Sequence, residues 1–338
     1  MKHILFVDNF KLDFDNPMST LYISKCKKIC EAENVLKVDI SDKESVKSAI
    51  SDPIPKTVLL GQRCPSFYKA NKSFARVIDE NLSQLLLYTK SNNIKLYMLL
   101  QDTHPKTYRS LDTLTNFINK EKIDLIFTFY ENGESRFIRK ACINSKFYHL
   151  PHHIDTKIFH PLNNNDEKVY DILLYGDIHP THYPFRKRLF ELITKEADNY
   201  NLKVLYISPP VDPKTQGKVF DPDKCESGLA AKIRSAKYAI ATKSKYDYLV
   251  AKYFEIAACE TSIIGDMAAD ALKMPLFNDN YIKLNNKMTD SEIMECISNA
   301  VKTYDVNSVS KNRKSFALYI LDNYNLDVYL KKLLQILN

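Results

Sequence analysis

The chain has 338 residues, of which 45% are hydrophobic and 26% are charged, and its formal net charge is +7. This composition excludes a disordered chain, and the length suits two domains that each bury a core of their own. The excess of basic residues is compatible with a phosphate-bearing ligand, an acidic membrane surface or nucleic acid, and it does not choose among them.

Short apolar runs alternate with amphipathic helical patterns along the whole chain. Strands are expected at 3–8, 57–61, 95–101, 124–130, 146–151, 171–176, 203–208, 238–242 and 261–265. Helices are expected near 17–32, 72–91, 109–121, 134–143, 184–198, 228–236, 248–259, 290–303, 308–321 and 326–337. Continuous apolar strands separated by helices are typical of a parallel sheet covered on both faces, so the sequence predicts an α/β fold.

The polar stretch 161–168 follows a proline-containing segment and separates two sets of strands, which makes it the best linker. We therefore expect two Rossmann-like domains, at 1–160 and 161–320, and a terminal segment, 321–338. In doubly wound sheets, ligands bind beyond the carboxyl ends of the strands, so the loops that follow the strands are where functional residues are expected.

The cysteines and the chain start bear on the compartment. Seven cysteines without a CxxC pair favour reduced thiols in a cytoplasmic protein. A strand pattern begins at once, so we expect no signal peptide, and no apolar run is long enough to span a bilayer. Membrane contact would then be peripheral, for example through Lys25, Lys27 and Lys28, although such residues usually serve only to make a helix soluble.

The helix expected after strand 171–176 begins with an unusual concentration of cations. Pro184 suits its first turn, and Arg186 and Arg188 follow, although cations at a helix N-terminus oppose the helix dipole. An anion bound there would reverse the penalty, because free N–H groups and arginines together bind phosphate. The alternative is a solvated basic helix start. Gly176 is the one glycine of this loop, so neither a P-loop nor a dinucleotide-binding fingerprint is present.

The segment 246–266 carries charges on an otherwise apolar helix that runs into a strand. Lys252 and Glu255 are three residues apart and share one helical face, and Asp247 lies eight residues before Glu255. Such charges either meet water, as on many surface helices, or meet a ligand.

Taken together, DILLYG, YPFRKRL, LAAKIRSAKYAIAT and AKYFEIAACETSIIGD resemble the carboxy-terminal half of GT-B glycosyltransferases, especially CgeB-like and group 1-like proteins, and are also similar to the phage DNA β-glucosyltransferase. The resemblance implies two Rossmann-like domains that face each other across a cleft, with the C-terminal helix crossing back to the first domain. It implies that Arg186, with Arg188, grips the donor diphosphate, that Lys252 assists, and that Glu255 receives the ribose hydroxyls. The spacing of Asp247 and Glu255 resembles the E-x7-E element of these enzymes. Glu260 stands where the family commonly has glycine.

Two side chains follow strand 95–101 and could act on an acceptor. A carboxylate and an imidazole, Asp102 and His104, could deprotonate a hydroxyl there, and Asp102 matches the catalytic base of the phage enzyme. The alternative is a capping or turn role, which suits Asp equally well. No metal site is expected, because the histidines at 149, 152 and 153 share their spacing with no acidic ligand.

The sequence thus predicts a metal-independent glycosyltransferase that moves a sugar from a nucleotide-sugar donor, a UDP-sugar, to an acceptor hydroxyl. The donor is a co-substrate, and no other cofactor is expected. The alternatives are a DNA-modifying glucosyltransferase, which the charge permits but does not favour, and a GT-B-like binding protein that has lost catalysis. A nucleotide-sugar epimerase is disfavoured by the missing dinucleotide fingerprint.

Overall fold

The structure is a computed structural model that describes residues 4–10, 20–51, 54–62, 64, 73–100, 111–132, 135–161, 168–207, 226–277, 280–304 and 306–338. The chain divides into two compact units, Met1–Pro151 with Tyr329–Asn338, and His152–Val328. Most of the linker expected at 161–168 lies outside the described residues, and so do Asp102 and His104.

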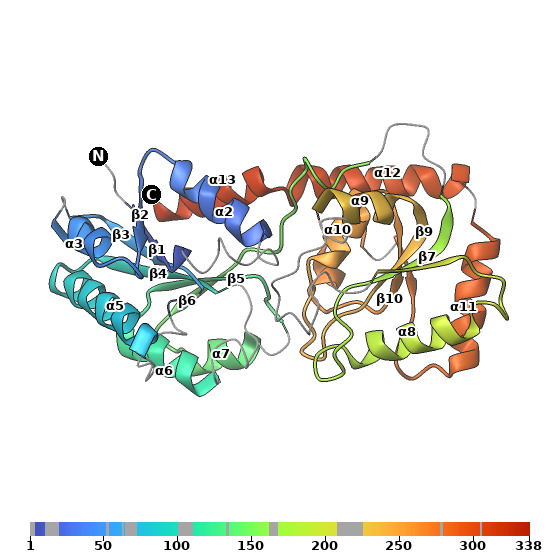
Figure 1. Ribbon diagram of the computed structural model, residues 1–338, viewed down its shortest axis with the longest axis horizontal. Coiled ribbons are helices and arrows are strands. Elements are labelled where there is room, and N and C mark those ends of the chain that lie inside the picture. Colours follow the sequence, from blue (N-terminus) through green and yellow to red (C-terminus); the bar gives the residue numbers. More distant parts are fainter. Residues whose placement is uncertain are drawn as a thin grey trace. The chain divides into compact units, whose positions relative to one another are not determined.

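The first unit contains a parallel sheet in the order β2-β1-β3-β4-β5-β6. Its strands are β1 (Ile4–Asp8), β2 (Val35–Asp39), β3 (Thr57–Leu60), β4 (Lys95–Leu100), β5 (Leu125–Thr128) and β6 (Lys146–His149). Its helices are α2 (Thr20–Glu31), α3 (Lys43–Ser51), α5 (Ser73–Ser91), α6 (Leu111–Glu121) and α7 (Ser135–Ala141). In Figure 1, α5, α6 and α7 lie on one side of this sheet and α2 on the other.

Helix α13 (Leu326–Leu337) joins the first unit from Tyr329 onward. The Lys25 ammonium of α2 lies 5.5 Å from the ring centroid of Tyr329 and 5.3 Å from that of Phe129. Lys25 is fully buried. It is therefore not a surface lysine, and the expectation that it contributes to membrane contact is wrong.

The second unit contains a parallel sheet in the order β11-β10-β9-β7-β8. Its strands are β7 (Tyr170–Tyr175), β8 (Val204–Ile207), β9 (Ala236–Ala241), β10 (Ser262–Gly265) and β11 (Tyr281–Lys283). Its helices are α8 (Pro184–Glu196), α9 (Glu226–Arg234), α10 (Lys252–Ala258), α11 (Asp290–Lys302) and α12 (Val306–Asn323), with a short 3-10 turn, Ala271–Lys273.

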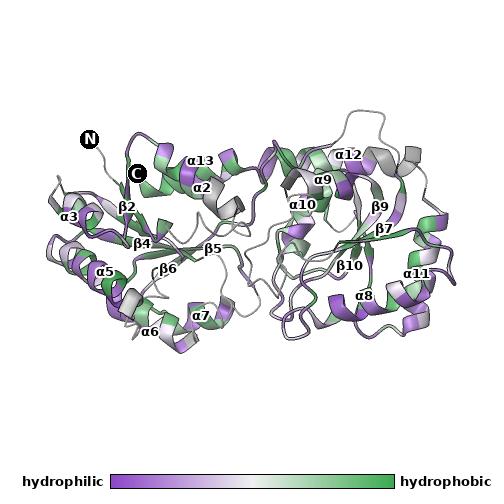
Figure 2. Cartoon of the chain, viewed as in Figure 1, coloured by the Kyte–Doolittle hydropathy of each residue, from purple (hydrophilic) through white to green (hydrophobic). Residues whose placement is uncertain are grey.

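Alternate side chains of these strands build two cores, one on each face of the second sheet. Leu173 and Ala239 pack with residues of α9, α10 and α12, whereas Leu174 and Ile240 pack with residues of α8 and α11. Figure 2 shows the apolar residues gathered on the strands and on the helix sides that face them. The α/β class with two parallel sheets, predicted from the sequence, is confirmed.

The order of strands fixes where each sheet can bind a ligand. Along the second sheet, β8 lies on one side of β7 and β9 on the other, so the chain reverses its winding between β7 and β9. In open parallel sheets, this topological switch point opens a crevice at the carboxyl ends of the two strands. A ligand of the second unit is therefore expected beyond Tyr175 and Ala241.

Candidate functional site at the β7–β9 switch point

Arg186 is buried at the start of α8 and reaches the switch point. Its Nε donates to the Thr242 hydroxyl at 3.2 Å, its Nη2 to the Thr242 carbonyl at 3.0 Å and its Nη1 to the Asp177 carbonyl at 2.9 Å. The Tyr183 ring lies against the guanidinium, 3.9 Å from ring centroid to Cζ. A guanidinium has five N–H donors, so two remain after these three bonds, held in a fixed orientation.

Lys252, the first residue of α10, brings a second buried cation to the same place. Its ammonium donates to the Tyr175 carbonyl and lies 3.8 Å from the centroid of the Tyr175 ring. The pKa of Lys252 is held well below its usual value, chiefly by burial and then by the charge of Arg186. Only 3% of Arg186 and 6% of Lys252 is exposed, so two positive charges have been taken out of water side by side. Burying like charges together is costly unless an anion joins them.

Gly176 allows the two cations to approach the backbone closely. It directly follows β7 and has a φ of +87°, which favours glycine. A Cβ at this position would lie 2.8 Å from Lys252 Nζ and 3.7 Å from Arg186 Nη1. A side chain at this position would collide with the Lys252 ammonium, so the arrangement of the two cations requires glycine.

Glu255 supplies the negative charge of the cluster. It lies one helical turn after Lys252 on α10, and its Oε2 accepts a hydrogen bond of 3.2 Å from the Tyr175 hydroxyl. Burial raises the pKa of the Glu255 carboxyl, while Lys252, Tyr175 and Arg186 act in the opposite direction. The carboxyl of Glu255 is thus in electrostatic contact with both basic side chains of the cluster.

Asp266 stands at the end of the neighbouring strand, β10. Its carboxylate accepts a hydrogen bond of 3.0 Å from the Lys243 backbone N–H, and burial raises its pKa to about 6. The charge of Arg186 lowers the pKa of Asp266, which places the carboxylate within electrostatic reach of the cationic pair. Gly176, Thr242 and Asp266 thus follow three adjacent strands directly, as expected for a site at the carboxyl edge of the sheet.

The structure brings Gly176, Arg186, Lys252 and Glu255 together, but it does not bring Arg188 to them. Side chains two residues apart on an α-helix project from opposite flanks of that helix. Arg188 there contacts the Asp290 carboxylate at 2.5 Å and donates to the Met288 and Asn286 carbonyls. Arg188 thus holds α8 against the start of α11.

Asp247 lies in the loop before α10 and not near the start of the helix, because the helix begins at Lys252 and not near residue 248 as predicted. It has a φ of +60°, and its Oδ1 pairs with the Lys243 ammonium at 2.7 Å. Lys243 thus connects the two aspartates: its side chain binds Asp247, and its backbone N–H binds the Asp266 carboxylate.

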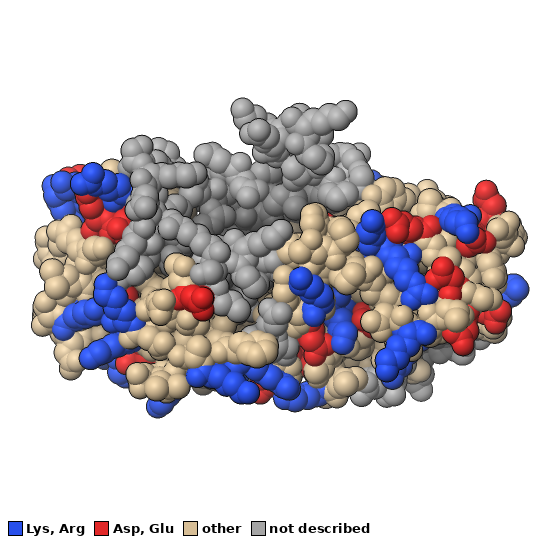
Figure 3. Space-filling view, turned by 90° about the horizontal axis from the view of Figure 1, so that it is seen from below, with Lys and Arg blue, Asp and Glu red and all other residues tan. Residues whose placement is uncertain are grey.

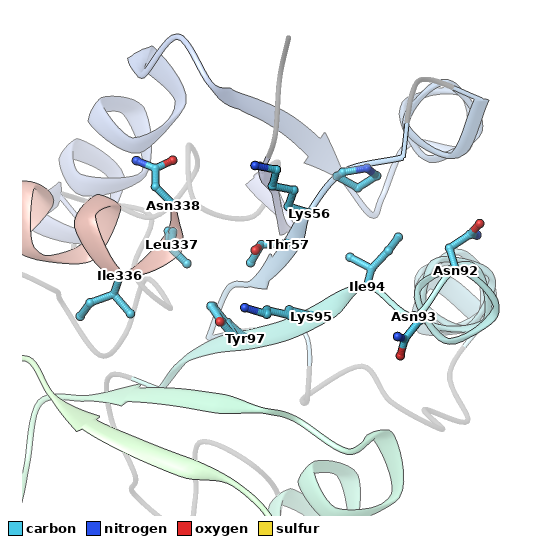
Figure 4. Close-up of a pocket in the computed structure, with 11 residues that line it drawn as sticks. Lys56, Thr57, Asn92, Asn93, Ile94, Lys95, Tyr97, Ile336, Leu337 and Asn338 are labelled. Atoms are coloured by element: carbon cyan, nitrogen blue, oxygen red, sulfur yellow. The ribbon is translucent and has the colours of Figure 1, made fainter.

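Two cavities lie at the opposite ends of the strands. One, of about 300 Å³ in the first unit, is bordered by Thr57 and Lys95, the first residues of β3 and β4, and by Asn338 (Figure 4). The other, of about 390 Å³ in the second unit, is bordered by Asp171, Lys203 and Lys237 at the beginnings of β7, β8 and β9. Neither contains a residue of the cationic cluster. Because ligands of doubly wound sheets bind at the carboxyl ends, the main site is not expected at these cavities.

Two general features of the described residues complete the description. In the part of the chain that the structure describes, no group of three His, Cys, Asp or Glu side chains is arranged to hold a metal ion. Within the same residues, no helix combines the length and the apolar character needed to cross a bilayer.

Comparisons with known proteins give the fold a name. No protein-family model matches the chain, and no curated protein is similar in sequence. Among solved structures, HepE of Anabaena in complex with UDP and glucose is similar over 100% of this chain and 99% of its own, with a TM-score of 0.54 and 10% identity. Sucrose-phosphate synthase of Thermosynechococcus elongatus covers 99% and 98%, with a TM-score of 0.58 and 10% identity.

A third similar structure is an α-glucosyltransferase in complex with UDP-glucose and DNA containing an abasic site. It covers 99% of this chain and 98% of its own, with a TM-score of 0.53 and 11% identity. Identities this low establish the fold and no more. The GT-B fold expected from the sequence is confirmed.

Proposed function

We propose that the protein is a glycosyltransferase that moves a sugar from a nucleoside diphosphate sugar, a UDP-sugar, to an acceptor hydroxyl. The observation that carries the proposal is the pair of buried cations, Arg186 and Lys252, beside Gly176 at the carboxyl end of β7. A diphosphate supplies the anion that this pair lacks, and Glu255 stands one helical turn away to accept the ribose hydroxyls. Structures of the same fold bind UDP and UDP-glucose, which supports this choice of donor.

In the proposed reaction, the bond between the anomeric carbon and the β-phosphate oxygen breaks, and the acceptor oxygen forms a new bond to that carbon. Negative charge grows on the departing diphosphate, where the remaining N–H donors of Arg186 and Lys252 stabilise it. Because these donors are already fixed by Thr242, Asp177 and Tyr175, little reorganisation is needed as the charge develops. In this proposal Asp102, with His104, takes the proton of the acceptor hydroxyl.

Glu255→Gln tests the ribose contact. Glutamine keeps the volume and an acceptor oxygen but loses the charge, so each of the two ribose bonds is weakened by about 1 kcal/mol. We expect UDP affinity, measured by calorimetry, to fall about 10- to 100-fold while the melting temperature of the free protein changes little. Glu295→Gln, on the exposed face of α11, is the matched control and keeps full affinity. Unchanged UDP binding in Glu255→Gln would remove Glu255 from the site.

Donor binding is also expected to take up protons. The pKa of Lys252 is lowered by burial and by Arg186. A diphosphate placed beside the ammonium stabilises its charged form and raises this pKa again. The complex therefore binds more protons than the free protein does. We expect proton uptake on UDP binding to grow as the pH is raised towards about 9, below the ordinary lysine pKa. Calorimetry in buffers of different ionisation enthalpy measures it. Equal uptake by Lys252→Met would assign the proton to another group.

DNA is the second candidate acceptor, because one protein of the same fold was captured with UDP-glucose and DNA. Offering duplex DNA and carbohydrate acceptors in the same transfer assay separates the two. A protein that binds UDP but neither transfers nor hydrolyses any nucleotide-sugar in a donor screen would instead be a binding module.

A further inference from the structure

One surface of the first unit combines exposed apolar side chains with cations. Phe137 on α7 is 63% exposed, and Ile143 in the turn that follows α7 is 81% exposed. Around them lie Lys122, Arg136, Lys140 and Lys146, all exposed. We call these six residues the α6–α7 surface. Figure 3 looks from below onto the side on which α6 and α7 lie in Figure 1, and it shows Lys and Arg side chains gathered along the lower edge.

Hydrogen bonds hold the parts of this surface next to one another. The Asn119 side chain of α6 donates to the Ala141 carbonyl at the end of α7, at 2.9 Å. The Ser145 hydroxyl donates to the Ile123 carbonyl at 2.6 Å, and the Lys146 N–H to the Asp124 carbonyl at 2.9 Å. The end of α6 therefore runs beside the turn that presents Ile143. On α7, Phe137 and Lys140 are three residues apart and share one face.

Three of the four cations of this surface are not in ion pairs with the described residues. Within the described ranges, Lys122, Lys140 and Lys146 have no acidic partner at ion-pairing distance. The two carboxylates nearest to Lys122 in sequence have other partners, since Asp124 accepts from the Leu96 N–H at 2.8 Å and Glu121 is buried and pairs with Lys90 at 2.8 Å. These three lysines are thus available to an external anion, while Arg136 donates to the Asn132 side chain.

The apolar residues decide which anionic partner fits. Nucleic-acid phosphates would accept the lysines but offer no apolar phase to Phe137 and Ile143. The surface of an anionic membrane offers both, because lipid phosphates lie directly above the acyl chains. We propose that the α6–α7 surface docks on an anionic lipid membrane, with its cations at the headgroups and with Phe137 and Ile143 inserted below them. This inference does not depend on sugar transfer.

The absence of tryptophan from the sequence permits a direct test of insertion. Phe137→Trp gives the full-length protein a single indole on the proposed surface. We expect its emission to shift to shorter wavelength with vesicles of phosphatidylcholine and phosphatidylglycerol in equal parts, but not with phosphatidylcholine alone. Leu318→Trp, at a 56% exposed position on α12, is the matched control and shows no shift. An unshifted Phe137→Trp emission with the anionic vesicles would overturn the proposal.

Co-sedimentation with the same vesicles tests the charge. Each cation removed is expected to weaken binding about fivefold, so the triple variant Lys122→Gln, Lys140→Gln and Lys146→Gln loses about 100-fold. Phe137→Ser with Ile143→Ser is also expected to release the protein from the vesicles. Thermal melting shows whether these variants, all at exposed positions, remain folded. Equal sedimentation of the folded variants, or binding to duplex DNA without binding to vesicles, would contradict a lipid-docking surface.

Discussion

Replacing Arg186 with Met is expected to lower kcat for sugar transfer by about 10²- to 10³-fold, the usual effect of removing one donor from a charge-stabilising site. UDP affinity should fall as well, because the guanidinium is buried and its two remaining N–H groups face the diphosphate in our proposal. Methionine keeps most of the apolar stem that packs at the start of α8. Steady-state kinetics with a UDP-sugar and calorimetry with UDP measure the two effects.

Arg188→Met is the matched control, since it removes the same group two residues away. Arg188 binds Asp290 and the Met288 carbonyl, so its loss should loosen the contact between α8 and α11 and cost about 1 kcal/mol of stability. UDP affinity should not change. Equal losses of UDP affinity in both variants would mean that the effect of Arg186→Met reflects a damaged helix and not a lost diphosphate contact.

Gly176→Ala is expected to abolish detectable UDP binding and to destabilise the protein. Alanine is strained at a φ of +87°, at a cost of about 1–3 kcal/mol, and its Cβ would lie only 2.8 Å from Lys252 Nζ. The ammonium must then move into the space that we assign to the diphosphate. Thermal unfolding and UDP calorimetry report the two losses separately.

Combining Gly176→Ala with Lys252→Met separates strain from collision. The backbone strain persists in the double variant, but the collision with the ammonium disappears, so the stability losses should be less than additive. Fully additive losses, or a Gly176→Ala protein that binds UDP normally, would contradict the assignment of this space to the ligand.

Much of the fold could be predicted from the sequence, because buried parallel strands appear as continuous apolar runs and alternate with helices. The elements that were not predicted lack this signal. Lys37 interrupts the pattern of β2, and the short β11 is only three residues long. The structure shows them as strands because β2 pairs with β1 and β11 pairs with β10.

The candidate site was predicted only where local spacing determines it. Lys252 and Glu255 share a helical face, so their proximity follows from the sequence alone. The partner of Arg188 lies about a hundred residues away, and nothing local indicates it. Thr242 and Asp266 were not predicted, although each directly follows an apolar strand, and the rule that ligands bind at strand ends could have identified both. Tyr175 ends an apolar strand and is typical of core, so its hydroxyl contact with Glu255 gave no signal.

The central claim is that buried cations at the β7–β9 switch point hold a diphosphate. Calorimetric titration of the unmodified protein with UDP and with uridine tests it most directly, because the two ligands differ only in the diphosphate. The account predicts that UDP binds at least about 100-fold more tightly than uridine, since two charge-assisted contacts are lost with the phosphates. Equal affinities for the two ligands, or no binding of UDP or any other nucleoside diphosphate, would contradict it.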